Sequence, residues 1–208
     1  MQNDEIKQAI LRGDFATVAQ GVKENLDAGQ EPGDVLNQAL VPPMIEVGEQ
    51  YERGEVYVPE MLVAARAMKA GMEILRPELV KAGVQPLGKV ALGTVQGDIH
   101  DIGKNLVGMM LEGAGFEVLD LGINVPTEAF KEAVNDGIDI LAMSGLLTTT
   151  IPAMPEVIQA LQDAGVRDQV KIMVGGAPVT EAFKQDIGAD GYAPDAASAV
   201  RVAKDLVA

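Results

Sequence analysis

The sequence predicts two parts of different fold class, an N-terminal bundle of helices followed by an α/β domain with a doubly wound, five-stranded parallel sheet. Three observations support this prediction. Apolar residues recur at helical spacing from Asn3 to about Ala82. A stretch of small residues and proline, Ala82–Gly88, follows as a candidate linker. Beyond it, short apolar runs alternate with helical segments, which is the pattern of strands and helices in an α/β sheet.

Residues 1–84 are expected to form four or five helices that pack as a bundle. Asp27-Ala28-Gly29 and Gly54 supply helix ends, and Pro32 and Pro59 lie near helix starts, where a missing N–H costs little. Pro42-Pro43 should kink or break the helix that contains it. The apolar stripes of the three main helical stretches are Ile6, Ala9, Ile10, Phe15, Val18, Val22 and Leu26; Val35, Leu36, Ala39, Leu40, Met44, Ile45 and Val47; and Met61, Leu62, Ala65, Met68, Met72 and Leu75.

Residues 88–208 are expected to form a Rossmann/flavodoxin-like sheet covered by helices on both faces, because its strands are apolar along their whole length. The expected strands are Lys89–Val95, Phe116–Leu121, Ile138–Met143, Val170–Val174 and Ala189–Tyr192, and the expected helices are Ile102–Gly113, Thr127–Asp136, Ile151–Ala164, Thr180–Ile187 and Asp195–Val207.

Composition excludes several classes of function. The chain has no cysteine and one histidine, so disulfides, thiolate metal sites, cysteine nucleophiles and His-rich metal sites are excluded. A net charge of −15 argues against a nucleic-acid partner, since phosphate binding needs clustered Lys and Arg. The N-terminus resembles no signal peptide and no apolar run approaches a membrane span, so the expected location is the cytoplasm, without a membrane partner.

The single histidine, His100, lies in the loop between the first expected strand and its helix, where such folds bind ligands. Asp98 and Asp101 flank it, and Gly103 allows close approach of a ligand to the backbone. A metal-bound imidazole usually donates its other N–H to a carboxylate, which Asp98 would supply. One imidazole suits a large flat metal cofactor better than a metal cage. The structural alternative is an acidic loop with Asp101 as the N-cap of the next helix.

Two further segments follow strands at the same expected edge of the sheet. Ser144–Thr150 carries four hydroxyl side chains. These hydroxyls either bind a ligand or belong to a loop in which Thr150 is the N-cap of the next helix. Gly175-Gly176 ends the fourth strand, either as a tight turn or as a place where a flat group passes. Each segment alone is a weak signal.

Together, and in this order, the three segments resemble the cobalamin-binding domain of methionine synthase and its relatives. The shared pattern is Asp98-x-His100-x-x-Gly103, then Ser144-x-Leu146, then Gly175-Gly176. The N-terminal part resembles the helical cap domain of the same group, in Gly54–Glu60 and Ala64–Lys69. The two-domain length is similar to that of the corrinoid proteins of three-component methyltransferase systems, which serve methanol, methylamines, methoxylated aromatics or quaternary amines.

The resemblance implies that cobalamin binds base-off/His-on, with its own dimethylbenzimidazole detached and His100 as the lower cobalt ligand. Asp98 would bond to the imidazole and Thr150 would extend the chain, so that this relay takes up a proton when the imidazole leaves cobalt. The detached tail would lie in a slot between two groups of residues. The remaining implied contacts are Ser144, Leu146 and Thr148 on one side of the slot, Gly175 and Gly176 on the other, Gly93 and Gln96 near the first strand, and an apolar lid of Tyr57, Val58, Met61 and Met68, for which ordinary bundle core is the alternative.

The implied function is a methyl carrier that cycles between Co(I) and methyl-Co(III). A substrate-specific methyltransferase would load the methyl group, and a second methyltransferase would pass it to tetrahydrofolate or a coenzyme thiol. A reductive activating protein would rescue oxidised cobalt. The chain is too short to add a catalytic barrel, so it is not expected to be an enzyme by itself, and Gln85–Gly88 would be the hinge of the cap.

Three other functions remain open from the sequence. A cobalamin-dependent sensor or regulator would share both domains but needs an output module, and no basic helix-turn-helix segment is visible. A small subunit of an adenosylcobalamin isomerase would resemble only the C-terminal part. A flavodoxin-like module without cofactor would not need the three-part pattern.

Overall fold

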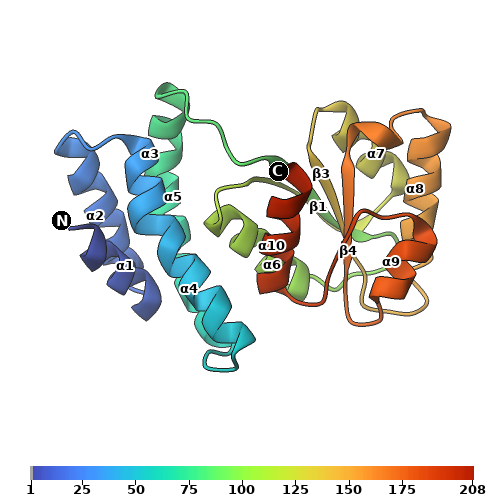
Figure 1. Ribbon diagram of the computed structural model, residues 1–208, viewed down its shortest axis with the longest axis horizontal. Coiled ribbons are helices and arrows are strands. Elements are labelled where there is room, and N and C mark those ends of the chain that lie inside the picture. Colours follow the sequence, from blue (N-terminus) through green and yellow to red (C-terminus); the bar gives the residue numbers. More distant parts are fainter. Residues whose placement is uncertain (1) are drawn as a thin grey trace. The chain divides into compact units, whose positions relative to one another are not determined.

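The computed structural model describes residues 2–208 and divides the chain into two compact units (Figure 1). The first unit contains the chain up to Pro86 together with Glu112–Gly115, and the second contains Leu87–Leu111 and Phe116–Ala208. The first unit is helical, as predicted. Its elements are α1 (Asn3–Arg12), α2 (Phe15–Asp27), α3 (Pro32–Val35), a π-helical segment η1 (Leu36–Leu40), α4 (Val41–Glu52) and α5 (Val58–Lys81).

The two consecutive prolines distort their helix without ending it. Pro42 and Pro43 lie in the first turn of α4, and the widened π-helical turn of η1 comes directly before them. Neither proline can donate to a carbonyl one turn back, and each ring crowds that carbonyl. The wider turn relieves this crowding, and the N–H of Val41 bonds to the carbonyl of Leu36, five residues earlier.

Helix α5 packs closely on the rest of the bundle through a glycine. A Cβ on Gly71 would lie 2.9 Å from a methyl carbon of Val18 and 3.2 Å from one of Leu40, so α2 and α5 approach more closely than larger residues would permit. Met61 and Met68 are buried in this unit.

The second unit is the predicted doubly wound sheet, with five parallel strands in the order β2-β1-β3-β4-β5. Figure 1 shows α6 and α10 on one face of the sheet and α7, α8 and α9 on the other. The strands are β1 (Lys89–Val95), β2 (Glu117–Val125), β3 (Ile140–Ser144), β4 (Lys171–Gly175) and β5 (Gly191–Ala193), and the helices are α6 (Ile102–Gly113), α7 (Thr127–Asn135), α8 (Ala153–Asp163), the 3₁₀ turn η2 (Arg167–Gln169), α9 (Glu181–Ile187) and α10 (Ala196–Val207).

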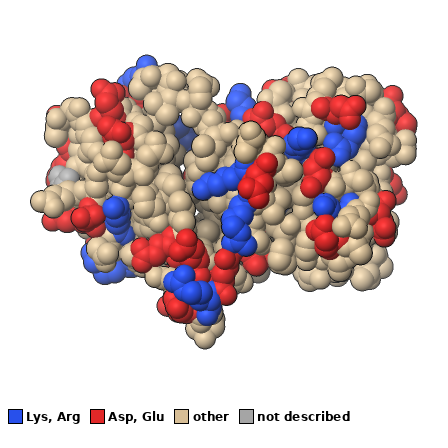
Figure 2. Space-filling view, viewed as in Figure 1, with Lys and Arg blue, Asp and Glu red and all other residues tan. Residues whose placement is uncertain are grey.

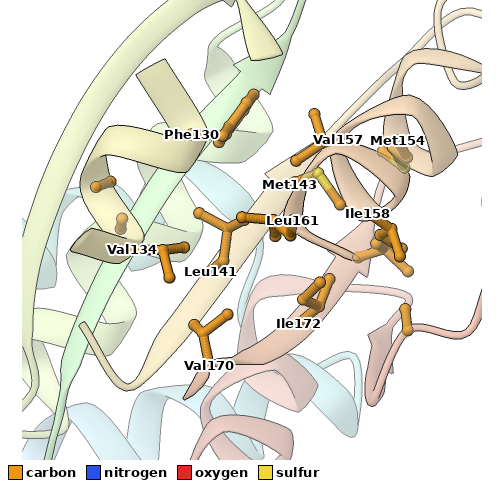
Figure 3. Close-up of a cluster of buried hydrophobic side chains, with 14 of the residues drawn as sticks. Phe130, Val134, Leu141, Met143, Met154, Val157, Ile158, Leu161, Val170 and Ile172 are labelled. Carbon is orange, nitrogen blue, oxygen red and sulfur yellow. The ribbon is translucent and has the colours of Figure 1, made fainter. Parts of the chain in front are cut away.

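A mainly aliphatic core fills the space between the sheet and α7 and α8 (Figure 3). Phe130 of α7 is fully buried in it, and a Cβ on Gly93 of β1 would lie only 2.8 Å from the Phe130 ring. A larger residue than glycine would therefore clash with the core at position 93. This packing explains the glycine at a position that the resemblance assigns to cofactor contact.

Several element boundaries differ from the prediction by one to four residues, and two of these differences change an expected feature. β2 continues to Val125 instead of ending near Leu121, and its register with β1 shifts twice, so a bulged strand edge replaces the expected loop. α8 begins at Ala153 instead of Ile151 and its N-cap is Pro152, so the structural alternative in which Thr150 caps this helix is wrong.

Charged side chains of both signs are spread over the molecular surface. On the face drawn in Figure 2, Lys and Arg lie scattered among Asp and Glu. Over residues 2–208, no helix combines the length and the apolar character needed to span a bilayer.

A candidate cofactor site at the carboxyl edge of the sheet

The residues predicted to bind a ligand gather where the strand order reverses. β1 and β3 are neighbours in the sheet, and the chain leaves them toward opposite sides, to β2 and to β4. Loops after two such strands diverge and leave a crevice at the carboxyl edge, the usual ligand site of a doubly wound sheet. The loop after β1 carries Asp98 and His100, and the loop after β3 carries Leu146 and Thr150.

Asp98 connects these two loops. Its side chain is fully buried, and its Oδ1 accepts from the backbone N–H of His100 at 3.0 Å and contacts the imidazole Nδ1 at 2.6 Å. Its Oδ2 accepts from the N–H of Leu146 at 2.7 Å and from the Thr150 hydroxyl at 2.8 Å. The predicted Asp98–imidazole bond is present, and Thr150 meets the same carboxylate.

This hydrogen bonding keeps Asp98 ionised. Burial alone would raise its pKa, but the N–H groups of His100 and Leu146, the imidazole and the Thr150 hydroxyl outweigh burial and hold the pKa well below its usual range. An ionised carboxylate only accepts hydrogen bonds, so Nδ1 carries the proton in the neutral imidazole. The lone pair of Nε2 is then available to a ligand, on a side chain that is 47% exposed.

Two polar residues that we had not selected from the sequence hold the His100 loop. Thr94 is fully buried at the end of β1, and its hydroxyl donates to the carbonyl of His100 at 2.9 Å. Asn124, near the end of β2, accepts from the N–H of Gly97 with Oδ1 at 2.8 Å and donates its own N–H to the carbonyl of Asp98 at 2.9 Å. A threonine inside an otherwise apolar strand was the available signal for Thr94. No comparable signal marks Asn124.

Apolar side chains next to these polar residues in the sequence are exposed to solvent. Ile99 and Ile102 are 69% and 74% exposed, and Leu146 and Leu147 are each 42% exposed. Gly103, in the first turn of α6, has no atom within 4 Å of the position a Cβ would take. Apolar side chains and a bare backbone exposed beside one free imidazole nitrogen suit a ligand with a broad apolar surface.

The other predicted residues differ in exposure and in local contacts. Asp101 directly precedes α6, and its carboxylate accepts from the side-chain amide of Asn105 at 3.1 Å. Gln96 and Thr148 are exposed. Tyr57, at the start of α5, is 68% exposed, whereas Met61 and Met68 are buried, in agreement with the bundle-core alternative.

Gly175 and Gly176 lie against neighbouring backbone. Ser144 of β3 pairs with Gly175 of β4. A Cβ on Gly175 would lie 3.0 Å from the carbonyl oxygen of Ala193, and one on Gly176 would lie 1.9 Å from that of Gly145. Packing between strand ends therefore accounts for both glycines without a ligand.

The described side chains do not form a site for a metal ion bound by protein ligands alone. Among the residues that the structure describes, no group of three or more His, Cys, Asp or Glu side chains is placed to hold a metal ion. His100 must therefore act as a single donor if it binds metal.

Comparisons with known proteins agree with this geometry. Two family models, each described as a B12 binding domain, match residues 88–201 and 2–76. A corrinoid protein of Desulfitobacterium hafniense is 41% identical over 98% of this chain and 96% of its own length. Trimethylamine corrinoid protein 1 of Methanosarcina acetivorans is 44% identical over 93% of this chain and 91% of its own length.

Solved structures lead to the same family. The methanol:cobalamin methyltransferase complex MtaBC of Methanosarcina barkeri contains a chain that superposes with a TM-score of 0.86 at 31% identity, covering 98% of this chain and 78% of that one. A cobalamin-binding protein of Desulfitobacterium hafniense superposes with a TM-score of 0.79 at 31% identity, covering 100% and 99%. The predicted family is confirmed: this chain belongs to the B12-binding proteins, as a cobalamin-binding corrinoid protein of the kind found in methyltransferase systems.

Proposed function

We propose that this protein carries a methyl group between two methyltransferases on a bound cobalamin, with His100 as the lower axial ligand of cobalt and the cofactor's own base detached. The observation that carries the proposal is the His100–Asp98–Thr150 chain, which leaves one imidazole nitrogen free at an exposed apolar edge. When bound, the corrin cobalt supplies the chemistry of accepting and releasing a methyl group.

The residues present fit this cofactor. A corrin needs one axial nitrogen below the ring and an apolar surface beside it, which Nε2 of His100 and the exposed side chains of Ile99, Ile102 and Leu146 would provide. The open space at Gly103 would admit the edge of a ring close to the backbone. The carboxylate behind Nδ1 fixes the tautomer and the orientation of the ring, as in other metal-bound histidines.

The same three residues would hold a proton when His100 leaves the metal. Nε2 is then free to take a proton, and the resulting imidazolium is stabilised by the buried, ionised carboxylate of Asp98. The Thr150 hydroxyl and the Leu146 N–H keep that carboxylate ionised. Ligation and proton uptake at His100 are thereby coupled.

Methyltransferases are the partners that the relatives favour. The structure of MtaBC is a methyltransferase complex, and close relatives are named trimethylamine and dimethylamine corrinoid proteins. We therefore propose a substrate-specific methyltransferase as donor partner, with methylated amines as the first substrates to screen. An acceptor methyltransferase using tetrahydrofolate or a thiol, and a reductive activating protein, complete the proposed system.

The test compares wild type with His100→Ala after mixing each protein with methylcobalamin and desalting. Wild type should retain the corrinoid with the absorption spectrum of a nitrogen-ligated, base-detached methyl-cobalt form. His100→Ala should retain less and show a shifted spectrum, and added imidazole should restore the wild-type spectrum, because the half-exposed side chain leaves access to the metal.

Two outcomes would overturn parts of the proposal. Unchanged occupancy and spectrum in His100→Ala would refute axial ligation by His100. A wild-type protein that holds cobalamin but transfers no methyl group with methyltransferases for methylamines, methanol, methoxylated aromatics or quaternary amines would instead match a cobalamin-dependent regulator.

A further inference from the structure

The end of β2 contains an unusual backbone conformation. Among residues 2–208, Asn124 is the one non-glycine residue with a positive φ, at 50°. The left-handed region costs most L-residues roughly 1–2 kcal/mol, and asparagine tolerates it better than most because its short side chain can bond to nearby backbone. Such conformations persist where the surrounding structure holds them, often beside functional sites.

Asn124 uses this conformation to hold the two residues that lead into His100. Its N–H donates to the carbonyl of Asp98 at 2.9 Å, and its Oδ1 accepts from the N–H of Gly97 at 2.8 Å. Gly97 itself has a φ of 85°, a turn that suits glycine. From the other side, Thr94 holds the carbonyl of His100. The backbone of the loop is therefore bonded both before and at the histidine.

The strand that carries Asn124 is anchored in turn. The Oδ1 of Asp120 accepts from the N–H of Gly122 at 2.9 Å and from the ammonium of Lys104 at 2.5 Å. Lys104 belongs to α6 and is almost fully buried, so this ion pair fixes the bulged part of β2 to the helix that follows the His100 loop. The bulge places Asn124 beside the loop instead of beside β1 in regular register.

We infer that Asn124 is a positioning residue for His100, acting through the backbone of Gly97 and Asp98 to aim the imidazole. The inference deepens the proposed function, because an aimed Nε2 matters most if it binds cobalt. The contact itself belongs to this chain alone, so it can be tested without cofactor.

Two variants separate the side chain of Asn124 from its backbone. Asn124→Gly keeps the backbone N–H and permits positive φ, so it removes only the side-chain acceptor for Gly97. Asn124→Asp keeps an oxygen acceptor and also tolerates positive φ. A purely structural role for the turn conformation would leave Asn124→Gly like wild type.

The first readout is the tautomer of the imidazole in the cofactor-free protein. The chain has one histidine, so ¹⁵N spectra at a pH where it is neutral show a single pair of ring nitrogens. Wild type and Asn124→Asp should show mainly the Nδ1–H form. In Asn124→Gly the Nε2–H population should rise about five-fold, the factor that one net hydrogen bond supplies. An unchanged ratio in Asn124→Gly, or an equal rise in both variants, would overturn the inference.

The second readout separates this inference from the proposed function. In the cobalt(II) form of the loaded protein, electron paramagnetic resonance shows whether one nitrogen is bound along the axis. Axial coupling that is strong in wild type and Asn124→Asp but weakened in Asn124→Gly supports both proposals. Wild type without axial nitrogen coupling would overturn ligation by His100, while the tautomer ratio would still decide the role of Asn124.

Discussion

Replacing Gly103 by alanine should stabilise the empty protein and weaken cobalamin binding. Gly103 lies in the first turn of α6, and nothing lies within 4 Å of the position that a Cβ would take. Alanine loses less conformational entropy than glycine in a helix, which is worth about 0.5–1 kcal/mol. For a domain of this size, that free energy raises Tm by about 1–4 °C.

Binding should change in the opposite direction if the corrin lies against this backbone. A methyl group forced into a well-packed contact costs about 1–3 kcal/mol. That cost corresponds to an affinity weaker by about 5- to 150-fold. The assay is thermal unfolding of the cofactor-free protein, together with equilibrium binding of methylcobalamin followed by absorbance.

Gly108→Ala, in the same helix, is the matched control. A Cβ there would lie 3.3 Å from a methyl carbon of Leu92 in β1, so crowding offsets the helix gain and Tm should not rise. Its affinity for cobalamin should stay at the wild-type value, because this glycine faces the sheet. A Gly103→Ala protein with raised Tm and unchanged affinity would refute the placement of the corrin beside Gly103.

Three further predictions concern the network behind His100 and the strand ends. Asp98→Asn should lower the free energy of unfolding by about 2–4 kcal/mol in urea, because an amide group cannot accept from all the donors around that carboxylate; a loss below about 1 kcal/mol would contradict the network. Thr150→Val should cost about 1–2 kcal/mol, against no measurable change for the exposed Thr148→Val, in the same titration. Gly176→Ala should lower the free energy of unfolding by at least about 3 kcal/mol, because its Cβ would lie 1.9 Å from the carbonyl oxygen of Gly145. Loss of cobalamin binding in that variant would therefore reflect misfolding. Near-normal stability would contradict the packing around Gly176.

Acid should destabilise the protein through Asp98. Because its pKa is lower in the folded than in the unfolded chain, its contribution is fully present above the unfolded pKa of about 4. It is lost progressively as the pH falls below that value toward the folded pKa. Urea midpoints measured from pH 5 to pH 3 should fall more steeply for wild type than for Asp98→Asn, and parallel curves would refute the contribution.

The fold was predictable because its signals are local. Strand and helix periods, the linker and the loop that carries His100 all lie in short windows of sequence, and the bond between Asp98 and His100 spans only two residues. The predictions that differ from the structure concern residues whose conformation depends on contacts with distant parts of the chain. β2 extends past Leu121 because β1 pairs with it. The helix-cap alternative for Thr150 fails because its hydroxyl donates to the carboxylate of Asp98, 52 residues away in the chain, as the family resemblance implied.

The sequence by itself determined that one imidazole, next to an acid and between glycines, would stand at the carboxyl edge of a parallel sheet. Only the tertiary structure showed that Gly93 and Gly176 are small because Phe130 and Gly145 lie against them, and that Asn124 holds the histidine loop. Those roles depend on which side chains and carbonyls meet across strands far apart in the chain. Such contacts follow from the register and bulges of the strands, which the local pattern of polar and apolar residues does not encode.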